Sequence, residues 1–264
     1  MAPDTKSWVP FEHLIKAGTP NLLRVEPATR ARLGVILPSV NTVVEPWFSR
    51  VLASDLRVHA TRMLLDSALS PDALRRMDHE EGMDAAVRLA SCRPHAVAYC
   101  CTASSIVQGV EYDRDLQRGL EKATGAPSFT AVGAIIDALN VLGAKSIAIA
   151  SPYTDAIDHA ETAFFQGSGF TILRAANLGI ADTFELASPT ARDIYALAER
   201  AWYPGADALL ISCLNMNSQE VVAQIESQIG RPVVTSTTAT LWKLLRSAGV
   251  QDRIPGYGRL LSDH

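Results

Sequence analysis

The arrangement that most constrains how this 264-residue chain can fold is a regular alternation of two kinds of segment. Short runs rich in Val, Ile and Leu recur along the chain, and longer segments with helical apolar periodicity lie between them. Strands that are apolar along their whole length suit a parallel sheet with helices on both faces, joined by right-handed crossovers. The sequence therefore predicts an α/β fold with doubly wound parallel sheets.

The strands expected from the short apolar runs lie at 32–37, 57–62, 95–100, 146–150, 170–174, 207–212 and 232–234. The helices expected between them lie near 43–53, 71–91, 107–124, 131–142, 155–168, 189–201, 218–229 and 238–248.

The two halves of the chain show the same order of helical segments, turn residues and extended pieces. Cys101 and Cys213 are each followed by a helical segment, a Gly-x-Pro sequence, a short extended piece and a second helical segment. Glycine commonly ends a helix and proline favours an extended start, so this order indicates the same succession of elements twice. We therefore expect two similar Rossmann-like lobes that are related by a pseudo-twofold axis.

The charge balance and the hydropathy exclude some classes of partner. The chain has 24 Lys and Arg residues against 28 Asp and Glu, so no broad basic face for nucleic acid is expected. No apolar run approaches the ~18 residues that a membrane span needs, and the first residues lack the apolar core of a signal peptide. We expect a cytoplasmic protein with a small-molecule partner, and neither nucleic acid nor membrane as a partner.

The four cysteines fit neither a disulfide framework nor a zinc site. No Cys-x-x-Cys sequence occurs, and the six histidines are scattered without ligand-like spacing. No glycine-rich phosphate-binding sequence follows any expected strand. We therefore expect free thiols, no metal and no nucleotide cofactor.

Two of these thiols occupy similar positions. Cys101 and Cys213 each end an apolar run and precede small or polar residues. A free cysteine usually serves packing, and we expect that role for Cys92 and Cys100. Cys101 and Cys213 instead lie at strand-to-helix junctions, where the N-terminus of the next helix would stabilise a thiolate and lower the thiol pKa. Such a thiol can act as a base or a nucleophile.

Polar residues also gather where the expected strands end. Ser39 and Asn41 follow the first strand, Thr102 follows the third, Tyr153 the fourth and Asn215 the penultimate one. These side chains can serve as helix caps, and helix N-termini with such caps also bind carboxylates. In an open parallel sheet the ligand crevice lies beyond the carboxyl ends of the strands, so facing lobes would bring these clusters to one cleft.

Five stretches carry a resemblance to a known family, and they lie at 33–45 (LGVILPSVNTVVE), 101–105 (CTASS), 151–153 (SPY), 212–213 (SC) and 255–260 (PGYGRL). With them the chain resembles the aspartate/glutamate racemase superfamily. Within it, the chain is similar to the branch of maleate cis-trans isomerases and arylmalonate decarboxylases. The resemblance extends from about residue 31 to the end.

This resemblance implies two Rossmann-like lobes with the active site between them and no cofactor. It also implies that the helix following each half packs on the opposite lobe. The expected division is an N-terminal extension at 1–30, a first lobe at 31–129 plus 236–264, and a second lobe at 130–235.

The resemblance further implies a reaction that uses both thiols. Cys101 would be the nucleophile and Cys213 the acid and base in a cis-trans isomerisation of a small unsaturated dicarboxylate. The alternatives are a two-cysteine amino-acid or hydantoin racemase, a decarboxylase that uses Cys213 alone, and a small-acid binding protein without catalysis. Relatives are monomers or homodimers. The implied substrate contacts come from Ser39, Asn41, Thr102, Ala103, Tyr153, Leu214 and Asn215.

Two positions depart from the family pattern. The family isomerases carry an asparagine near 179–183, where this sequence offers Asp182 and Thr183. A carboxylate that faced a dianionic substrate would repel it, so either Asp182 points away or the substrate is not maleate. Ala103 stands where relatives often have serine, which removes a hydrogen-bond donor.

Overall fold

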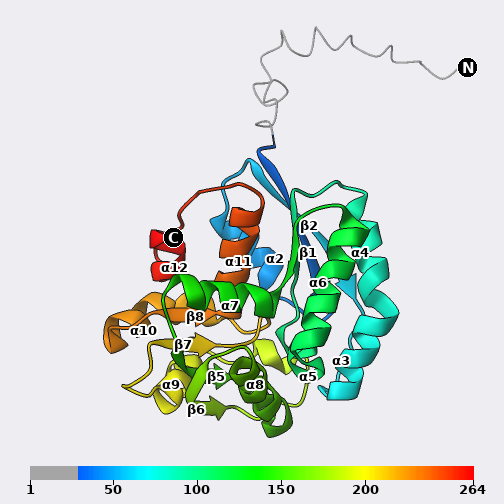
Figure 1. Ribbon diagram of the computed structural model, residues 1–264. Helices are drawn as coiled ribbons and strands as arrows, with labels where there is room; N and C mark the ends of the chain where they lie inside the picture. Colours follow the sequence, from blue (N-terminus) through cyan, green and yellow to red (C-terminus); the bar gives the residue numbers. More distant parts are fainter. Residues whose placement is uncertain (1–28) are drawn as a thin grey trace, which may run out of the picture.

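The computed structural model describes residues 29–264 and contains two four-stranded parallel sheets (Figure 1). The first has the order β2-β1-β3-β4 and contains β1 (Ala31–Pro38), β2 (Leu56–Met63), β3 (Ala96–Tyr99) and β4 (Ser128–Thr130). The second has the order β6-β5-β7-β8 and contains β5 (Ser146–Ser151), β6 (Thr171–Asn177), β7 (Ala208–Ile211) and β8 (Val233–Thr235). The same order of equivalent strands confirms the predicted pair of similar α/β lobes.

The helices are α2 (Val44–Val51), α3 (Pro71–Met77), α4 (Met83–Ala90), α5 (Thr102–Gln108), α6 (Val110–Thr124), α7 (Ala131–Val141), α8 (Asp155–Gly167), α9 (Ala191–Ala201), α10 (Val222–Ile229), α11 (Ser236–Ser247) and α12 (Arg259–Asp263). Three further turns are the π-helical η1 (Asp78–Gly82) and the 3-10 turns η2 (Glu185–Ala187) and η3 (Ser218–Val221).

The helices α7 and α11 pack against each other and link the two sheets (Figure 1). Each begins directly after the last strand of its sheet, where a threonine side chain, Thr130 or Thr235, caps the first turn. α11 contacts β3 of the first sheet as well as β8 of its own, and α7 contacts β8 as well as β4. Because both helices touch both sheets, the lobe boundaries at 129–130 and 235–236 stay a prediction.

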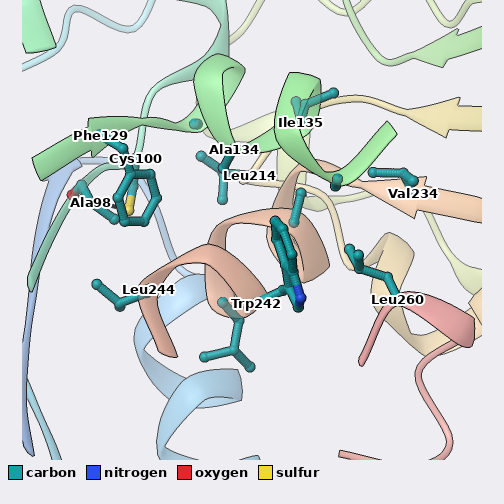
Figure 2. Close-up of a cluster of buried hydrophobic side chains, with 14 of the residues drawn as sticks. Ala98, Cys100, Phe129, Ala134, Ile135, Leu214, Val234, Trp242, Leu244 and Leu260 are labelled. Carbon is teal, nitrogen blue, oxygen red and sulfur yellow. Dashed lines mark hydrogen bonds between the residues drawn. The ribbon is translucent and has the colours of Figure 1, made fainter. Parts of the chain in front are cut away.

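The hydrophobic core continues across this helix pair. Figure 2 shows Trp242 of α11 in one cluster with Ile135 of α7 and Val234 of β8. Cys100, which follows β3, is fully buried in the same cluster, as its predicted packing role requires, and it also lines a cavity between the lobes. One core therefore holds the two lobes in a fixed relation.

Most of the predicted N-terminal extension at 1–30 lies outside the described residues. Arg30 forms ion pairs with Asp55 and with Asp252, so the entry to β1 is tied to the segment before α12. Within residues 29–264, no helix has the length and apolar character needed to cross a bilayer.

Candidate functional site

A small buried cavity of about 40 Å³ lies between the lobes, beyond the carboxyl ends of the central strands. The structure brings eight of the nine predicted site residues to its wall, and they are Asn41, Cys101, Thr102, Ala103, Tyr153, Cys213, Leu214 and Asn215.

Ser39 is the predicted residue that does not line the cavity. Its hydroxyl accepts a hydrogen bond from the N–H of Leu65 at 3.1 Å, and its own N–H donates to the carbonyl of Met63 at 2.6 Å. Leu65 does line the cavity. Ser39 therefore fixes the position of Leu65, which lines the cavity, without lining the cavity itself.

Cys101 directly precedes α5 and occupies its N-cap position, as the sequence predicted. The expected lowering of its pKa is wrong. Burial raises the pKa of the thiol to about 12, and the nearby Asp78 carboxylate acts in the same direction. The Ser104 hydroxyl and N–H lower the pKa, but desolvation outweighs them because only 6% of Cys101 is exposed.

Cys213 sits on strained backbone instead of at a helix start. Its φ of 89° lies in the left-handed region that non-glycine residues rarely adopt, and the next helical turn, η3, begins only at Ser218. The predicted helix at 218–229 is confirmed by η3 and α10, but because it starts only at Ser218, the expectation that its N-terminus stabilises the Cys213 thiolate is wrong. Burial raises the pKa of this thiol to about 12, while the Asn215 N–H, 3.4 Å from Sγ, and the Tyr153 hydroxyl lower it.

Ser236 connects the surroundings of the two thiols. Its hydroxyl oxygen accepts hydrogen bonds from the Cys213 N–H at 3.0 Å and from the Thr102 hydroxyl at 3.1 Å. It is fully buried at the first position of α11. Ser236 was not predicted as a site residue, because its contacts join segments that are distant in sequence and its only local signal is its place beside the Thr235 cap.

Asn41 and Asn215 join the lobes in a reciprocal way. The Asn41 amide donates to the carbonyl of Leu214 at 3.2 Å. The Asn215 side chain accepts from the Thr42 N–H at 3.0 Å and donates to the carbonyl of Val40 at 3.4 Å. Each asparagine therefore holds the strand-end loop of the other lobe at the edge of the cavity.

Asp182 points away from the cavity. Its side chain is exposed, and Oδ1 accepts hydrogen bonds from the N–H groups of Phe184 and Glu185 at 2.9 and 3.2 Å. Thr183 is buried and its hydroxyl donates to the carbonyl of Asp66 at 2.9 Å. The first of the two alternatives for Asp182 is therefore confirmed, and its charge does not face the site.

One side of the cavity is formed by four leucines that the sequence did not predict as site residues. Leu65, Leu69 and Leu74 come from the chain after β2, and Leu186 comes from η2 after β6. These two segments pair with each other, since the N–H of Leu69 donates to the carbonyl of Ala181 at 2.8 Å. Of the residues in 29–264 that line the cavity, none is Arg, Lys or His. The cavity therefore combines thiol, hydroxyl and amide groups with a leucine-rich side.

Comparison with known proteins places the chain among enzymes with this architecture. The family model for arylmalonate decarboxylase matches residues 33–261. A maleate isomerase from Pseudomonas putida is 30% identical over 244 residues, which cover 88% of this chain and 97% of the relative. An arylmalonate decarboxylase from Bordetella bronchiseptica is 27% identical over 233 residues, covering 86% and 97%.

Solved structures agree with this placement. A cysteine-to-serine variant of the Nocardia farcinica maleate cis-trans isomerase, with a covalently bound succinylcysteine intermediate, superimposes with a TM-score of 0.83 at 27% identity. The match covers 89% of this chain and 99% of that one. The extent of the family match and of these similarities shows that the chain belongs to the arylmalonate decarboxylase family, within the branch that also holds the maleate isomerases.

Proposed function

We propose that this protein is a cofactor-independent cis-trans isomerase of a small unsaturated dicarboxylate, of the maleate-to-fumarate type. The observation that carries the proposal is that thiols of both lobes, Cys101 and Cys213, lie on the wall of one cavity, which Cys100 also lines. The similarity to maleate isomerases over most of the chain supports it.

In the proposed reaction Cys101 adds as a thiolate to one alkene carbon of the substrate. The π-electron pair moves to the neighbouring carbon and its carboxylate, and Cys213 gives its proton to that carbon. Rotation about the new single bond follows. Cys213 then takes the proton back, and elimination of Cys101 restores the double bond in the trans geometry. Covalent addition of this kind divides one difficult step into two easier ones.

The polar wall can stabilise the charge that develops on the carboxylate. Tyr153 presents its hydroxyl at the cavity, and Asn41 donates one amide hydrogen to Leu214 and has a second one to offer. Thr102 and Asn215 line the cavity but already donate to Ser236 and to backbone carbonyls, so they hold its wall in place. One preorganised donor to such an oxyanion is typically worth about 3 kcal/mol of transition-state stabilisation. The side chains of this polar wall are buried, and a low local dielectric strengthens each of these interactions.

The leucine side of the cavity favours a second candidate function. Leu65, Leu69, Leu74, Leu186 and Leu214 form a surface that suits an apolar substituent more than a second carboxylate. A decarboxylase of an aryl- or alkyl-substituted malonate would use this surface and would need only Cys213 as the proton donor.

Proton NMR of the protein with maleate in D2O tests the proposal, because the vinyl protons of maleate and fumarate are resolved. We expect fumarate from the native chain and from Cys92→Ala, which is a matched control because Cys92 lies outside the cavity. Cys101→Ala and Cys213→Ala should both abolish it. Loss of carbon dioxide from a phenylmalonate, with Cys101→Ala still active, would replace the isomerase with the decarboxylase.

Other outcomes separate the remaining alternatives. Deuterium at the α-carbon of aspartate or a hydantoin would identify a racemase, and ligand binding without turnover would identify a small-acid binder. We also propose a cytoplasmic location, since two reduced thiols need a reducing compartment. Light scattering during gel filtration of the same sample would distinguish a homodimer from a monomer.

A further inference from the structure

One buried hydroxyl group lies behind the cavity wall and contacts the chain at both thiols. Ser236 is fully buried at the first position of α11 and does not line the cavity. Its oxygen accepts one hydrogen bond from the Cys213 N–H and a second from the hydroxyl of Thr102, the residue after Cys101. A serine oxygen can accept two hydrogen bonds, and here the two donors follow β7 of one sheet and β3 of the other.

The backbone at Cys213 needs a contact of this kind. Its φ of 89° is a conformation that a non-glycine residue keeps only where its surroundings hold it. The sheet holds the preceding residue, because the Ser212 N–H donates to the Ala150 carbonyl at 2.8 Å, and the next helical turn begins only at Ser218. Since φ is the rotation about the N–Cα bond, the bond from the Cys213 N–H to Ser236 acts directly on the strained angle.

The first lobe shows that the hydroxyl is not a requirement of the fold. α7 and α11 each begin after the last strand of a sheet, with Thr130 or Thr235 as the cap. The fully buried residue that follows the cap is Ala131 in α7 and Ser236 in α11. The thiol of the first lobe, Cys101, has an ordinary extended backbone with a φ of −131°. The hydroxyl therefore occurs in the half of the chain that contains the strained cysteine.

We propose that Ser236 is a positioning residue, whose hydroxyl holds Cys213 in its left-handed conformation and fixes it relative to the start of α5, where Cys101 lies. Ser236 acts through Cys213 and Thr102, since it lies outside the cavity wall. The consequence for turnover rests on the proposed isomerase, in which the two thiols must reach neighbouring carbons of one substrate.

The first test is amide hydrogen exchange of Cys213, followed by NMR in the native chain and in Ser236→Ala. Without its acceptor, the Cys213 N–H should exchange at least about tenfold faster. The Ser212 N–H is the internal reference, because its acceptor is the Ala150 carbonyl and it should keep its native rate. An unchanged rate at Cys213, or the same acceleration at Cys213 and Ser212, overturns the proposal.

The second test separates kcat from KM for maleate. A displacement of about 1 Å of a catalytic group can cost about 10²-fold in rate, so Ser236→Ala should lower kcat by about that factor. KM should stay within about twofold of the native value, because the side chains that line the cavity are unchanged. A merely structural loss would instead lower the fraction of folded enzyme, and kcat per folded molecule would stay the same.

The same turn of α11 provides the matched control. Thr237 is also fully buried, and its hydroxyl has no hydrogen-bond partner within residues 29–264. Thr237→Val removes this hydroxyl and should leave both the Cys213 exchange rate and kcat at their native values. An effect of Thr237→Val equal to that of Ser236→Ala would show general sensitivity of this turn and overturn the specific role of Ser236.

Two further variants keep the test decisive. Ser236→Thr keeps the hydroxyl and should retain slow exchange at Cys213. Ser236→Cys fills the same space with a sulfur that accepts hydrogen bonds only weakly, so it should accelerate this exchange even if Ser236→Ala does not fold.

The positioning role and the isomerase can fail separately. Hydrogen exchange does not require turnover, so a native chain that leaves maleate unchanged removes the isomerase while the Cys213 exchange rate still decides the role of Ser236. A native chain that forms fumarate, with Ser236→Ala exchanging faster at Cys213 but keeping the native kcat, leaves the isomerase standing and removes the positioning role.

Discussion

At the residue scale, burial governs the chemistry of this protein more than helix dipoles do. Cys101 stands at a helix N-terminus and Cys213 does not, yet the pKa of each is raised to about 12. Desolvation is the largest cause for both thiols. Their reactivity therefore depends on the groups that hydrogen-bond to the sulfur or take its proton.

Tyr153 offers a direct test of this dependence. Its hydroxyl lowers the pKa of Cys213, so Tyr153→Phe should raise that pKa and shift the alkaline limb of the Cys213 alkylation profile to higher pH. Turnover should fall by about 10²-fold if the hydroxyl also stabilises the developing charge. Tyr195→Phe, on the partly exposed face of α9, serves as the control, and an equal effect of both changes would contradict the role of Tyr153.

A buried carboxylate of the second lobe, Glu161, makes folding stability depend on pH. Burial raises its pKa from 4.5 to about 8, and neither oxygen has a hydrogen-bond partner within residues 29–264. Between these two values the unfolded chain has lost the proton while the native chain retains it. The free energy of unfolding should therefore fall as pH rises through this window, by roughly 5 kcal/mol in total.

Urea unfolding at a series of pH values measures this effect. Glu161→Gln cannot ionise, so the difference between its stability and that of the native chain should grow steadily from pH 5 to 8 and then level off. The exposed Glu121→Gln should follow the native curve. A constant difference between Glu161→Gln and the native chain would show that Glu161 does not titrate in this window.

The sequence predicted which residues line the cavity better than it predicted the pKa values of their thiols. The positions of Cys101, Cys213, Asn41 and Tyr153 followed from strand ends, because a parallel sheet brings those ends to one edge. The thiol pKa values depend on how deeply the folded lobes bury the site. The role of Ser236 depends on a contact between segments that are distant in sequence, and no local pattern encodes either feature.

At the element scale, regular segments were predictable and short or irregular ones were not. All seven expected strands exist, although β6 continues to Asn177. β4 was expected only as the short extended piece after the first Gly-x-Pro sequence, because Ser128 and Thr130 leave it without the apolar run that marked β8, a strand of the same length. α5 was largely missed, because the helix predicted at 107–124 covers α6 and only the end of α5. Gly109, with a φ of 92°, divides this region into the short α5 and the longer α6. The π turn η1 lies inside a helix that the periodicity predicted as continuous.

The junction before α12 provides a prediction at this scale. Gly258 has a φ of 87° and a ψ of 171°, and a Cβ there would collide with Val222 and lie 3.1 Å from Glu226 Oε1. Gly258→Ala should lower the free energy of unfolding by about 3 kcal/mol. Gly256 has a φ of 92° but open space around it, so Gly256→Ala should cost only about 1 kcal/mol.

Thermal and urea unfolding of the two variants measure this difference. Glu226 makes Gly258 the more sensitive position, since its carboxylate accepts from the N–H groups of Val233 and Arg259 at 2.9 Å each. If the added methyl group of Gly258→Ala pushed the Glu226 side chain aside, the hydrogen bonds to both the Val233 and the Arg259 N–H would be lost. Equal stability of the two variants would contradict the predicted collision.

At the scale of the whole molecule, the two lobes share their cores. One cluster contains Val35 of β1 and Leu210 of β7, and the other contains Val97 of β3 and Leu209 of β7. Because each cluster contains side chains from both sheets, unfolding of one sheet would expose apolar side chains of the other. We therefore expect a single cooperative unfolding transition, with coincident curves from far-UV circular dichroism and tryptophan fluorescence. Two separated transitions would show that the lobes unfold independently.

The pairing of the segments after β2 and β6 also has a consequence for affinity. A cavity of about 40 Å³ has room for roughly three water molecules, whereas a four-carbon dicarboxylate has eight non-hydrogen atoms. Where the paired segments have to part before the substrate enters, the observed dissociation constant exceeds the intrinsic one by the inverse of the population of the open form. A form populated at about 1% weakens binding about 100-fold. Changes that loosen the contact between Leu69 and Ala181 can thus tighten substrate binding without touching the substrate.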